Sequence, residues 1–267
     1  MQDLSRYQVS GTDQAFYIPN FVTEEEEIYL IRKITETSQT KWKKLPNRRL
    51  QILGGEVSSK NILIPQNLPL FLQSFPNIIE RIRSTGAFAS SPHGQPNHII
   101  LNEYLPGQGI MPHEDGPSYY PVVATLSLNS HAVFHYYQYH PDQQTNTSSP
   151  SPSSSEVSPT LGKSIDKTPI FSLLLEPRSL VITTSSLYTT HLHGIDDLEE
   201  DVFLSPGDHT GDDLSTQAIR IANVNLLAGQ KEREILRDGG VLKREVRYSL
   251  TCRDVERVAT KLPFLKH

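Results

Sequence analysis

Residues 98–128, HIILNEYLPGQGIMPHEDGPSYYPVVATLSL, hold two short stretches rich in β-branched and aromatic residues, separated by a segment with several Gly and Pro. Stretches of this kind, bounded by turn-forming residues, are typical of β-strands. Similar segments follow at 131–137, 170–176, 179–184, 189–194, 219–227 and 245–253. So many strands in succession predict a jelly-roll or barrel-like sandwich that begins near residue 97.

The chain before this strand-rich part has helical character. Residues 23–38 are predicted to form a helix, because Thr23 and Glu26 make a capping-box pair ahead of isoleucines at helical spacing. A second helical stretch covers 68–84, where Pro76 predicts a kink or break. The basic segment between the two is expected to be a loop or hairpin. The fold class is therefore α+β, with N-terminal helices packed on the strand core.

Composition limits the function classes. A length of 267 residues suits one domain, with 1–96 ahead of a strand core at 97–258. The net charge of −5 and the pI near 6.1 are unlike a strongly basic nucleic-acid-binding domain, although a local basic patch remains possible. Cys252 is the single cysteine, so no disulfide can form within the chain. We expect no secretory signal and no membrane span, and an intracellular location in nucleus and cytoplasm.

Two segments interrupt the strand pattern. Residues 141–168 are rich in Ser and Pro and nearly free of large apolar side chains. Because such a segment cannot offset its ordering entropy by burial, we predict a disordered insertion. Residues 195–216 are acidic and expected to be irregular.

The first chemistry-bearing group is His113-Glu114-Asp115. In an extended segment residues i and i+2 point to the same face, so His113 and Asp115 can reach one metal ion. A solvated surface turn explains the same triplet about equally well. The sequence HLHG supplies His191 and His193 as candidates for a third ligand, and their spacing does not choose between them. Two histidines and one carboxylate with open positions are the ligand set of non-haem Fe(II) oxygenases.

Strand periodicity also groups polar side chains. In RYSLTCR (247–253) Arg247 and Arg253 share one face with Ser249 and Thr251. An ordinary surface strand would show the same pattern, but two guanidinium groups can also hold a small dicarboxylate. Asn102 and Tyr104 share a face of 98–104 in the same way, either at a plain strand end or as hydrogen-bond donors to a ligand.

Taken in order, these motifs resemble the AlkB family of Fe(II)- and 2-oxoglutarate-dependent dioxygenases. The resemblance covers most of 97–255 and rests on five elements: Asn102 with Tyr104, Pro106 and Gly107; His113 with Asp115; TLSL at 125–128; His193-Gly194-Ile195; and Arg247 with Arg253. The intervals between ligand clusters are longer than in the bacterial family member, because of the two inserted segments.

This resemblance implies a double-stranded β-helix (jelly-roll) core. It implies that His113, Asp115 and His193 bind Fe(II), which selects His193 over His191. It also implies that Asn102, Tyr104, Arg247 and Arg253 hold the co-substrate 2-oxoglutarate, with Arg247 on the distal carboxylate. With O2 the products would be succinate and CO2, and an N-methyl substrate would release formaldehyde.

Family members that act on nucleic acid cover it with loops N-terminal to the core. Here that region carries basic side chains around one aromatic ring, a pattern that suits single-stranded DNA or RNA: Lys41, Trp42, Lys43, Lys44, Arg48 and Arg49. A solvated loop with a packed Trp42 is an equal alternative. We therefore expect a monomeric oxidative demethylase of methylated DNA or RNA. The alternatives are a protein or small-molecule hydroxylase or demethylase on the same scaffold, and a catalytically weak nucleic-acid-binding protein.

Overall fold

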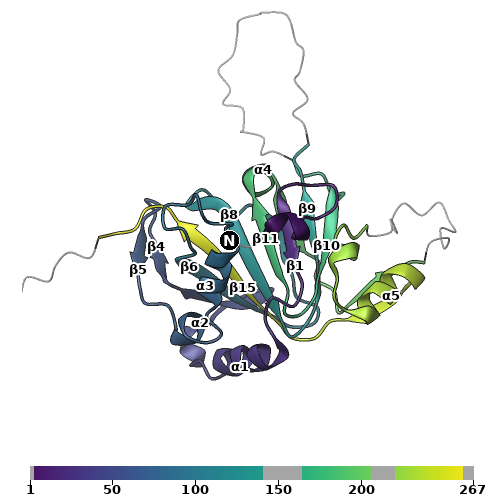
Figure 1. The fold of residues 1–267 in the computed structure, drawn as a ribbon, viewed down its shortest axis with the longest axis horizontal. Coiled ribbons are helices and arrows are strands. Elements are labelled where there is room, and N and C mark those ends of the chain that lie inside the picture. The colour runs from purple at the N-terminus through teal and green to yellow at the C-terminus, as the bar shows by residue number, and fades with distance from the viewer. Residues whose placement is uncertain (1–2, 141–163, 206–219, 261–267) are drawn as a thin grey trace, which may run out of the picture.

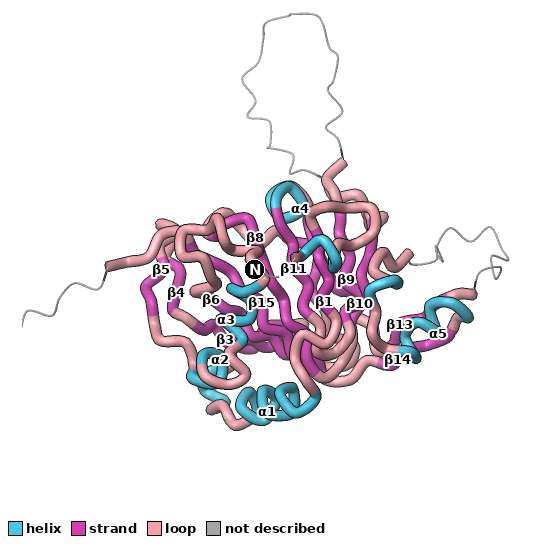
Figure 2. The backbone as a smooth tube through the Cα atoms, in the orientation of Figure 1, coloured by secondary structure: helices cyan, strands magenta, loops and turns pink. Residues whose placement is uncertain are grey.

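Two antiparallel β-sheets form the body of the protein in a computed structural model, which describes residues 3–140, 164–205 and 220–260 (Figures 1 and 2). The larger sheet has seven strands, in the order β1 (Ala15–Ile18), β11 (Leu180–Thr184), β8 (Tyr119–Leu128), β15 (Arg247–Val255), β6 (His98–Tyr104), β3 (Arg48–Leu53) and β2 (Lys43–Leu45). The smaller sheet has four, in the order β10 (Phe171–Leu175), β9 (Ala132–Tyr137), β12 (Leu192–Ile195) and β7 (Ile110–His113). Two facing sheets of this kind match the predicted jelly roll.

Short two-stranded pairs and helices complete the described elements. The pairs are β4 (Gly55–Val57) with β5 (Leu63–Pro65), and β13 (Glu200–Phe203) with β14 (Gly240–Lys243). The helices are α1 (Glu24–Thr35), α2 (Leu70–Gln73), α3 (Ile78–Ser84), α4 (Ser185–Thr189) and α5 (Gln230–Asp238). Three short 3₁₀ turns lie at Leu4–Tyr7, Gln39–Lys41 and Val224–Leu226. No helix among the described residues is both long and apolar enough to cross a membrane.

The N-terminal helices form as predicted. Thr23 caps α1, and its hydroxyl and the Glu26 carboxylate exchange hydrogen bonds with each other's backbone N–H. Pro76 separates α2 from α3. Both α1 and α3 bury aliphatic side chains in the cluster that covers one face of the larger sheet, including Leu30, Ile34, Ile78, Ile82, Leu101, Leu126 and Leu250. Truncating one of these leucines or isoleucines to Ala is expected to cost about 2–5 kcal/mol.

The chain before residue 97 also contributes strands to the larger sheet. The basic segment forms the β2–β3 hairpin, and β3 pairs with β6 so that Leu50 lies opposite Asn102. At the other edge β1 pairs with β11. Because β3 is a neighbour of β6, side chains from the N-terminal hairpin lie beside the motif at 102–104.

Most predicted strands are present, but the one at 219–227 is wrong. In the described part of this segment, Ile221 forms an isolated bridge to Ser172 and a 3₁₀ turn follows. The Asn223 side chain accepts a hydrogen bond from Leu174 N–H and donates one to its carbonyl, at 3.0 and 2.9 Å. The Asn223 side chain thus makes the hydrogen bonds to Leu174 that a neighbouring strand would otherwise make with its backbone. The residue composition of 219–227 does not distinguish these two arrangements.

The two predicted irregular segments lie partly outside the described residues, at 141–163 and 206–216. The remaining end of the first is ordered: His140 N–H donates to Ser164 O at 2.9 Å, and Ile165 bridges Tyr139. The prediction of disorder therefore fails for 164–166. The second segment begins with strand residues, since it includes Ile195 of β12 and all of β13.

Candidate metal and co-substrate site

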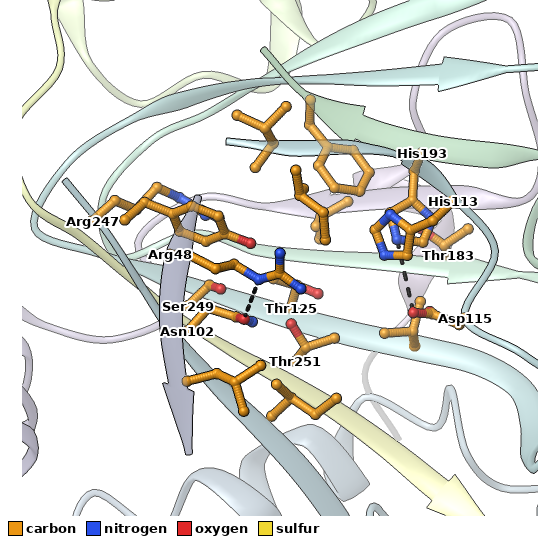
Figure 3. A pocket seen from close by; sticks show the side chains of 18 of the residues that line it. Arg48, Asn102, His113, Asp115, Thr125, Thr183, His193, Arg247, Ser249 and Thr251 are labelled. Atoms are coloured by element: carbon orange, nitrogen blue, oxygen red, sulfur yellow. Dashed lines mark hydrogen bonds and ion pairs between the residues drawn. The ribbon is translucent and has the colours of Figure 1, made fainter. Parts of the chain in front are cut away.

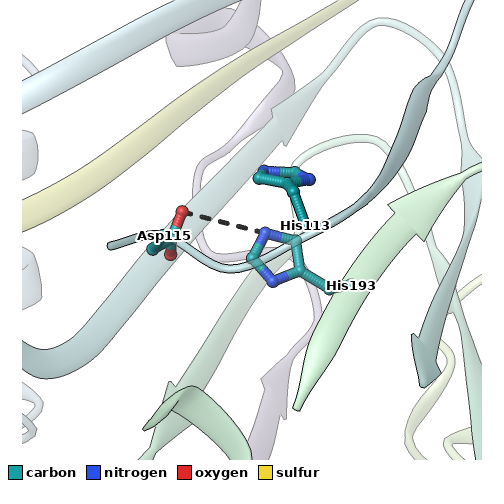
Figure 4. Close-up of side chains that lie close together, drawn as sticks. All are labelled: His113, Asp115 and His193. Atoms are coloured by element: carbon teal, nitrogen blue, oxygen red, sulfur yellow. Dashed lines mark ion pairs between the residues drawn. The ribbon is translucent and has the colours of Figure 1, made fainter. Parts of the chain in front are cut away.

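His113, Asp115 and His193 converge at one end of the smaller sheet (Figure 4). The β7–β12 ladder pairs His193 directly with His113, and their ring centroids lie 4.4 Å apart. Asp115 follows β7 by two residues, and one donor atom from each residue lies within 4.8 Å of the others. A side chain on Gly109 would collide with the Ile195 carbonyl, so glycine allows β7 and β12 to approach.

The donor set fits a divalent metal ion. His113 Nδ1 donates to the Met111 carbonyl at 2.9 Å, which leaves the lone pair of Nε2 for a ligand. One oxygen of Asp115, Oδ2, is buried without a hydrogen-bond partner. A buried carboxylate oxygen with no partner is costly, and a cation would satisfy it.

Protonation states also favour metal binding. Burial lowers the pKa of His193 to about 4 and lowers the pKa of His113, so both imidazoles are neutral at pH 7. Burial is the largest single effect on the pKa of Asp115 and acts to raise it, but the charge and hydrogen bond of Arg253 together with the two histidines outweigh burial and lower the pKa. Two neutral imidazoles and one carboxylate are the forms in which these side chains bind metals.

His191 does not join this cluster. Its Nδ1 lies 3.1 Å from the Ser186 carbonyl, and the residue is absent from the cavity wall described below. Because Leu192 lies between the two histidines, a two-residue shift in register would be needed to put His191 in the place of His193. The structure thus brings His193, and not His191, to His113 and Asp115.

A cavity of about 100 Å³ extends from the three residues into the space between the sheets (Figure 3). Its described wall includes four alternate residues of β15, namely Arg247, Ser249, Thr251 and Arg253, together with Asn102 and Tyr104 of β6. The predicted shared faces are confirmed, and these residues do not form a surface strand. Strand periodicity gave the faces correctly because it depends only on local backbone geometry.

Arg247 is buried at 4 % exposure without an acidic partner among the described residues. One terminal nitrogen donates to Ser127 Oγ at 2.7 Å, the guanidinium lies 5.7 Å from the Tyr104 ring centre, and Nε has no partner. Burial lowers the pKa of Arg247 to about 10. A cation that is buried and poorly paired provides a strong site for an incoming carboxylate.

Arg253 lies at the opposite end of the same strand face. Its Nη2 donates to Asp115 Oδ1, and its guanidinium lies 5.0 Å from the ring centre of Tyr119. Because Asp115 is a candidate metal ligand, this ion pair orients the carboxylate toward the two histidines. The two arginines therefore lie at different ends of the cavity, as the length of the strand requires.

The basic segment at 41–49 does not form one surface. Trp42 is only 9 % exposed and belongs to the hydrophobic core, so its predicted stacking on a base is wrong. Arg49 covers the Trp42 ring at 4.4 Å and forms a bidentate pair with Glu103 at 2.5 and 2.6 Å. The exposed cations that remain are Lys41, Lys43 and Lys44, whereas Arg48 enters the cavity.

Several cavity residues were not predicted. Phe134 stacks on the His193 ring at 5.2 Å and 22°, and Thr125 and Thr183 add hydroxyl groups to the wall. Applying the two-residue period to 122–128 and 179–184 would have placed Thr125 and Thr183 beside valines on one face. Phe134 has no comparable local signal, because its contact depends on pairing between β9 and β12.

Comparisons with known proteins agree with this geometry. Residues 14–253 match the model of the 2OG-Fe(II) oxygenase superfamily. The chain is 33 % identical over 264 residues to "Probable RNA/DNA demethylase ALKBH6" of Danio rerio, which covers 98 % of this chain and 95 % of that protein. It is also 33 % identical over 131 residues to an uncharacterized protein of Acanthamoeba polyphaga mimivirus, covering 46 % of this chain and 57 % of that protein.

Among solved structures, OsALKBH1 superposes with a TM-score of 0.50 at 13 % identity, covering 92 % of this chain and all of that one. At this identity the likeness concerns the fold alone. The family match, the near full-length relative and the shared fold all agree with the ligand-type residues and cavity described above. The chain therefore belongs to the 2OG-Fe(II) oxygenase superfamily, and within it to the AlkB family, as a dioxygenase that uses Fe(II), 2-oxoglutarate and O2.

Proposed function

We propose that this enzyme oxidatively removes N-methyl groups from methylated DNA or RNA and releases formaldehyde, succinate and CO2. The observation that carries the proposal is the similarity along 98 % of the chain to a relative named as a probable RNA/DNA demethylase. The cavity supports it, because a metal-ligand set and two anchoring arginines lie in one enclosed space.

In this proposal His113 through Nε2, Asp115 and His193 hold Fe(II). Arg247 binds the distal carboxylate of 2-oxoglutarate, since it is buried without an acidic partner among the described residues, whereas Arg253 is paired with Asp115. Asn102 and Tyr104 donate hydrogen bonds to the same molecule from β6. Arg253 lies near the metal end, where it orients Asp115 and contacts the other end of the co-substrate.

Fe(II) held by these residues would, with 2-oxoglutarate and O2, supply the chemistry that oxidises a methyl C–H bond to C–OH and converts 2-oxoglutarate to succinate and CO2. The protein's tasks are to bind, orient and exclude water. Phe134 fixes the His193 ring by stacking, and Arg253 fixes Asp115. An N-hydroxymethyl product then breaks its C–N bond, so that the carbon leaves as formaldehyde and the hydroxyl proton passes to the nitrogen.

The test is release of succinate and formaldehyde from methylated single-stranded DNA and RNA, with methylated peptides as a second panel. The proposal expects both products from a nucleic acid and neither from a His113→Ala variant. The matched variant His191→Ala should keep activity, because His191 lies outside the cavity. Turnover of peptides alone would overturn the nucleic-acid assignment.

Protein or small-molecule hydroxylation is the second candidate, and a specific observation favours it. Trp42 is buried and Arg49 is neutralised by Glu103, so two of the six predicted nucleic-acid contacts are occupied within the protein. The net charge of −5 adds no general attraction for phosphates. The monomeric state and the location in nucleus and cytoplasm stay predictions.

A further inference from the structure

Arg48, the first residue of β3, extends its guanidinium into the cavity between Asn102 and the metal-ligand residues (Figure 3). Its Nε donates to Asn102 Oδ1 at 3.1 Å. The two terminal nitrogens have no partner among the described residues. Unlike the buried Arg247 and Arg253, Arg48 is partly exposed, so it lies where the cavity meets solvent.

The surrounding backbone holds Arg48 in this place. Two residues later, Leu50 lies opposite Asn102 in the β3–β6 ladder. One residue earlier, Asn47 donates to Asp197 at 3.2 Å, which ties the turn of the β2–β3 hairpin to the segment after β12. Because β12 carries His193 and Ile195 of the cavity wall, this contact holds the hairpin turn, and with it Arg48, beside that wall.

The other guanidinium groups near this hairpin are already paired with a carboxylate or assigned to the co-substrate. Arg253 is paired with Asp115, and Arg49 is paired with Glu103 on the outer side of β3. Arg247 is the proposed anchor for 2-oxoglutarate. Arg48 therefore remains as a partly exposed cation in the cavity wall with two terminal nitrogens that have no partner among the described residues.

The net positive charge of the cavity wall affects which substrates can bind beside Arg48. The described wall of the cavity contains three guanidinium groups, from Arg48, Arg247 and Arg253, and one carboxylate, from Asp115. Fe(II) and doubly ionised 2-oxoglutarate carry opposite charges of equal size, so their binding leaves the positive excess unchanged. A substrate that is itself a cation is repelled here, whereas an uncharged group with a hydrogen-bond acceptor is attracted.

We propose that Arg48 is a specificity-determining residue that donates hydrogen bonds to an uncharged N-methylated base and disfavours methylated bases that carry a positive charge. This inference rests on the proposed function, because it assumes a nucleic-acid substrate. A planar fork of two N–H donors suits a ring nitrogen or carbonyl next to the methylated amine.

Two isomers of one methylated base provide a direct test. N6-methyladenine is uncharged and keeps N1 as an acceptor, whereas 1-methyladenine is a cation at neutral pH with N1 blocked. Single-stranded oligonucleotides of one sequence would carry either base, and succinate release would give kcat/KM for each. Wild type is expected to prefer N6-methyladenine. In Arg48→Gln this preference should fall about tenfold, which lies between the effect of one unit charge about 4 Å away in bulk water and its larger effect at the dielectric constant near a protein surface.

Matched variants separate charge from general damage. Arg48→Lys keeps the positive charge and should retain most of the discrimination against 1-methyladenine. Lys44→Gln removes an exposed charge from the same hairpin and should leave the ratio unchanged. Binding of the two oligonucleotides to iron-free protein, by fluorescence anisotropy, should show the same order without any turnover, since backbone phosphates contribute equally to both.

Each contrary result has a distinct meaning. Turnover with a ratio that Arg48→Gln leaves unaltered, or a wild-type preference for 1-methyladenine, overturns this inference alone. Weaker 2-oxoglutarate binding in Arg48→Gln with an unaltered substrate ratio also overturns it, and assigns Arg48 to the co-substrate. Succinate release from neither oligonucleotide overturns the inference, and absence of release from every methylated nucleic acid overturns the proposed function as well.

Discussion

His193 lies directly opposite His113 in the β7–β12 ladder, and the Phe134 ring stacks on it. This pairing is formed by residues 80 positions apart, and it decides which histidine of HLHG meets Asp115. The choice depends on strand register, because a shift by one residue would bring Leu192 inward and only a shift by two would place His191 opposite His113. The pairing of β7 with β12, and not the HLHG motif alone, therefore determines which histidine joins the ligand set.

Replacing His193 by Ala is expected to lower iron affinity by more than about 100-fold, since even partners outside the ligand set typically contribute 10–100-fold. His191→Ala removes the same side chain two residues away and should keep wild-type affinity. Anaerobic titration of the purified variants with Fe(II) measures both. Equal losses in the two variants would contradict the assignment of His193.

What the sequence predicts well is what local geometry determines. The capping box at Thr23, the break at Pro76 and the shared face of Arg247 and Arg253 all follow from short-range rules, and all are present. What it could not predict depends on distant partners. Trp42 is buried because β3 joins β6 and helices cover the sheet, so its solvent exposure could not be judged from neighbouring residues.

Arg48 and Arg49 illustrate the same limit within one dipeptide. Adjacent strand residues point to opposite sides, so one guanidinium enters the cavity and the other meets Glu103 and Trp42. From the sequence alone, both arginines belong to one basic cluster at 41–49. Only the pairing of β3 with β6 shows which of the two faces the site.

Arg247→Gln is expected to weaken 2-oxoglutarate binding by about 10–100-fold while iron binding is retained, because a charge-assisted hydrogen bond contributes about 1.5–3 kcal/mol. Calorimetric titration of the iron-loaded variant without oxygen measures the change. Arg257→Gln, at an exposed position beyond β15, is the matched control. The melting temperature of iron-free Arg247→Gln should not fall, since the substitution removes a poorly paired buried cation. If the affinity for 2-oxoglutarate is unchanged in this variant, Arg247 is not the anchor.

Acid should destabilise the protein through His98. This side chain is 3 % exposed, and burial, followed by the charge of Arg253, lowers its pKa to about 4. Its pKa in the unfolded chain is near 6.5, so between these values the unfolded state binds the proton and the folded state does not. Stability is therefore lost as the pH falls from about 6.5 toward 4, by about 2 kcal/mol between pH 7.5 and 5.

Urea unfolding of the iron-free protein at the two pH values measures this loss. His98→Gln should lose about 2 kcal/mol less than wild type over the same interval, because the titrating group is gone. His140→Gln, at an exposed position, should follow wild type. Identical pH dependence in wild type and His98→Gln would mean that His98 is protonated equally in both states.

The exposed lysines of β2 and of the 3₁₀ turn just before it are expected to contact phosphates. Replacing Lys41, Lys43 and Lys44 together by Gln should weaken binding of single-stranded nucleic acid. It should also reduce the slope of log affinity against log salt by about 2, since each neutralised phosphate contributes about 0.7 for single strands. Fluorescence anisotropy at a series of salt concentrations measures both quantities.

A triple replacement on α5 and β14 makes the same change in net charge at a different place. Lys231, Arg237 and Lys243 are exposed on these two elements. Figure 2 shows α5 and β14 at the opposite end of the structure from β3. If the hairpin is the contact surface, Gln at these three positions should leave the salt slope unchanged. Equal effects of the two triples would show that net charge alone drives binding, and the hairpin would lose its assignment as a nucleic-acid contact.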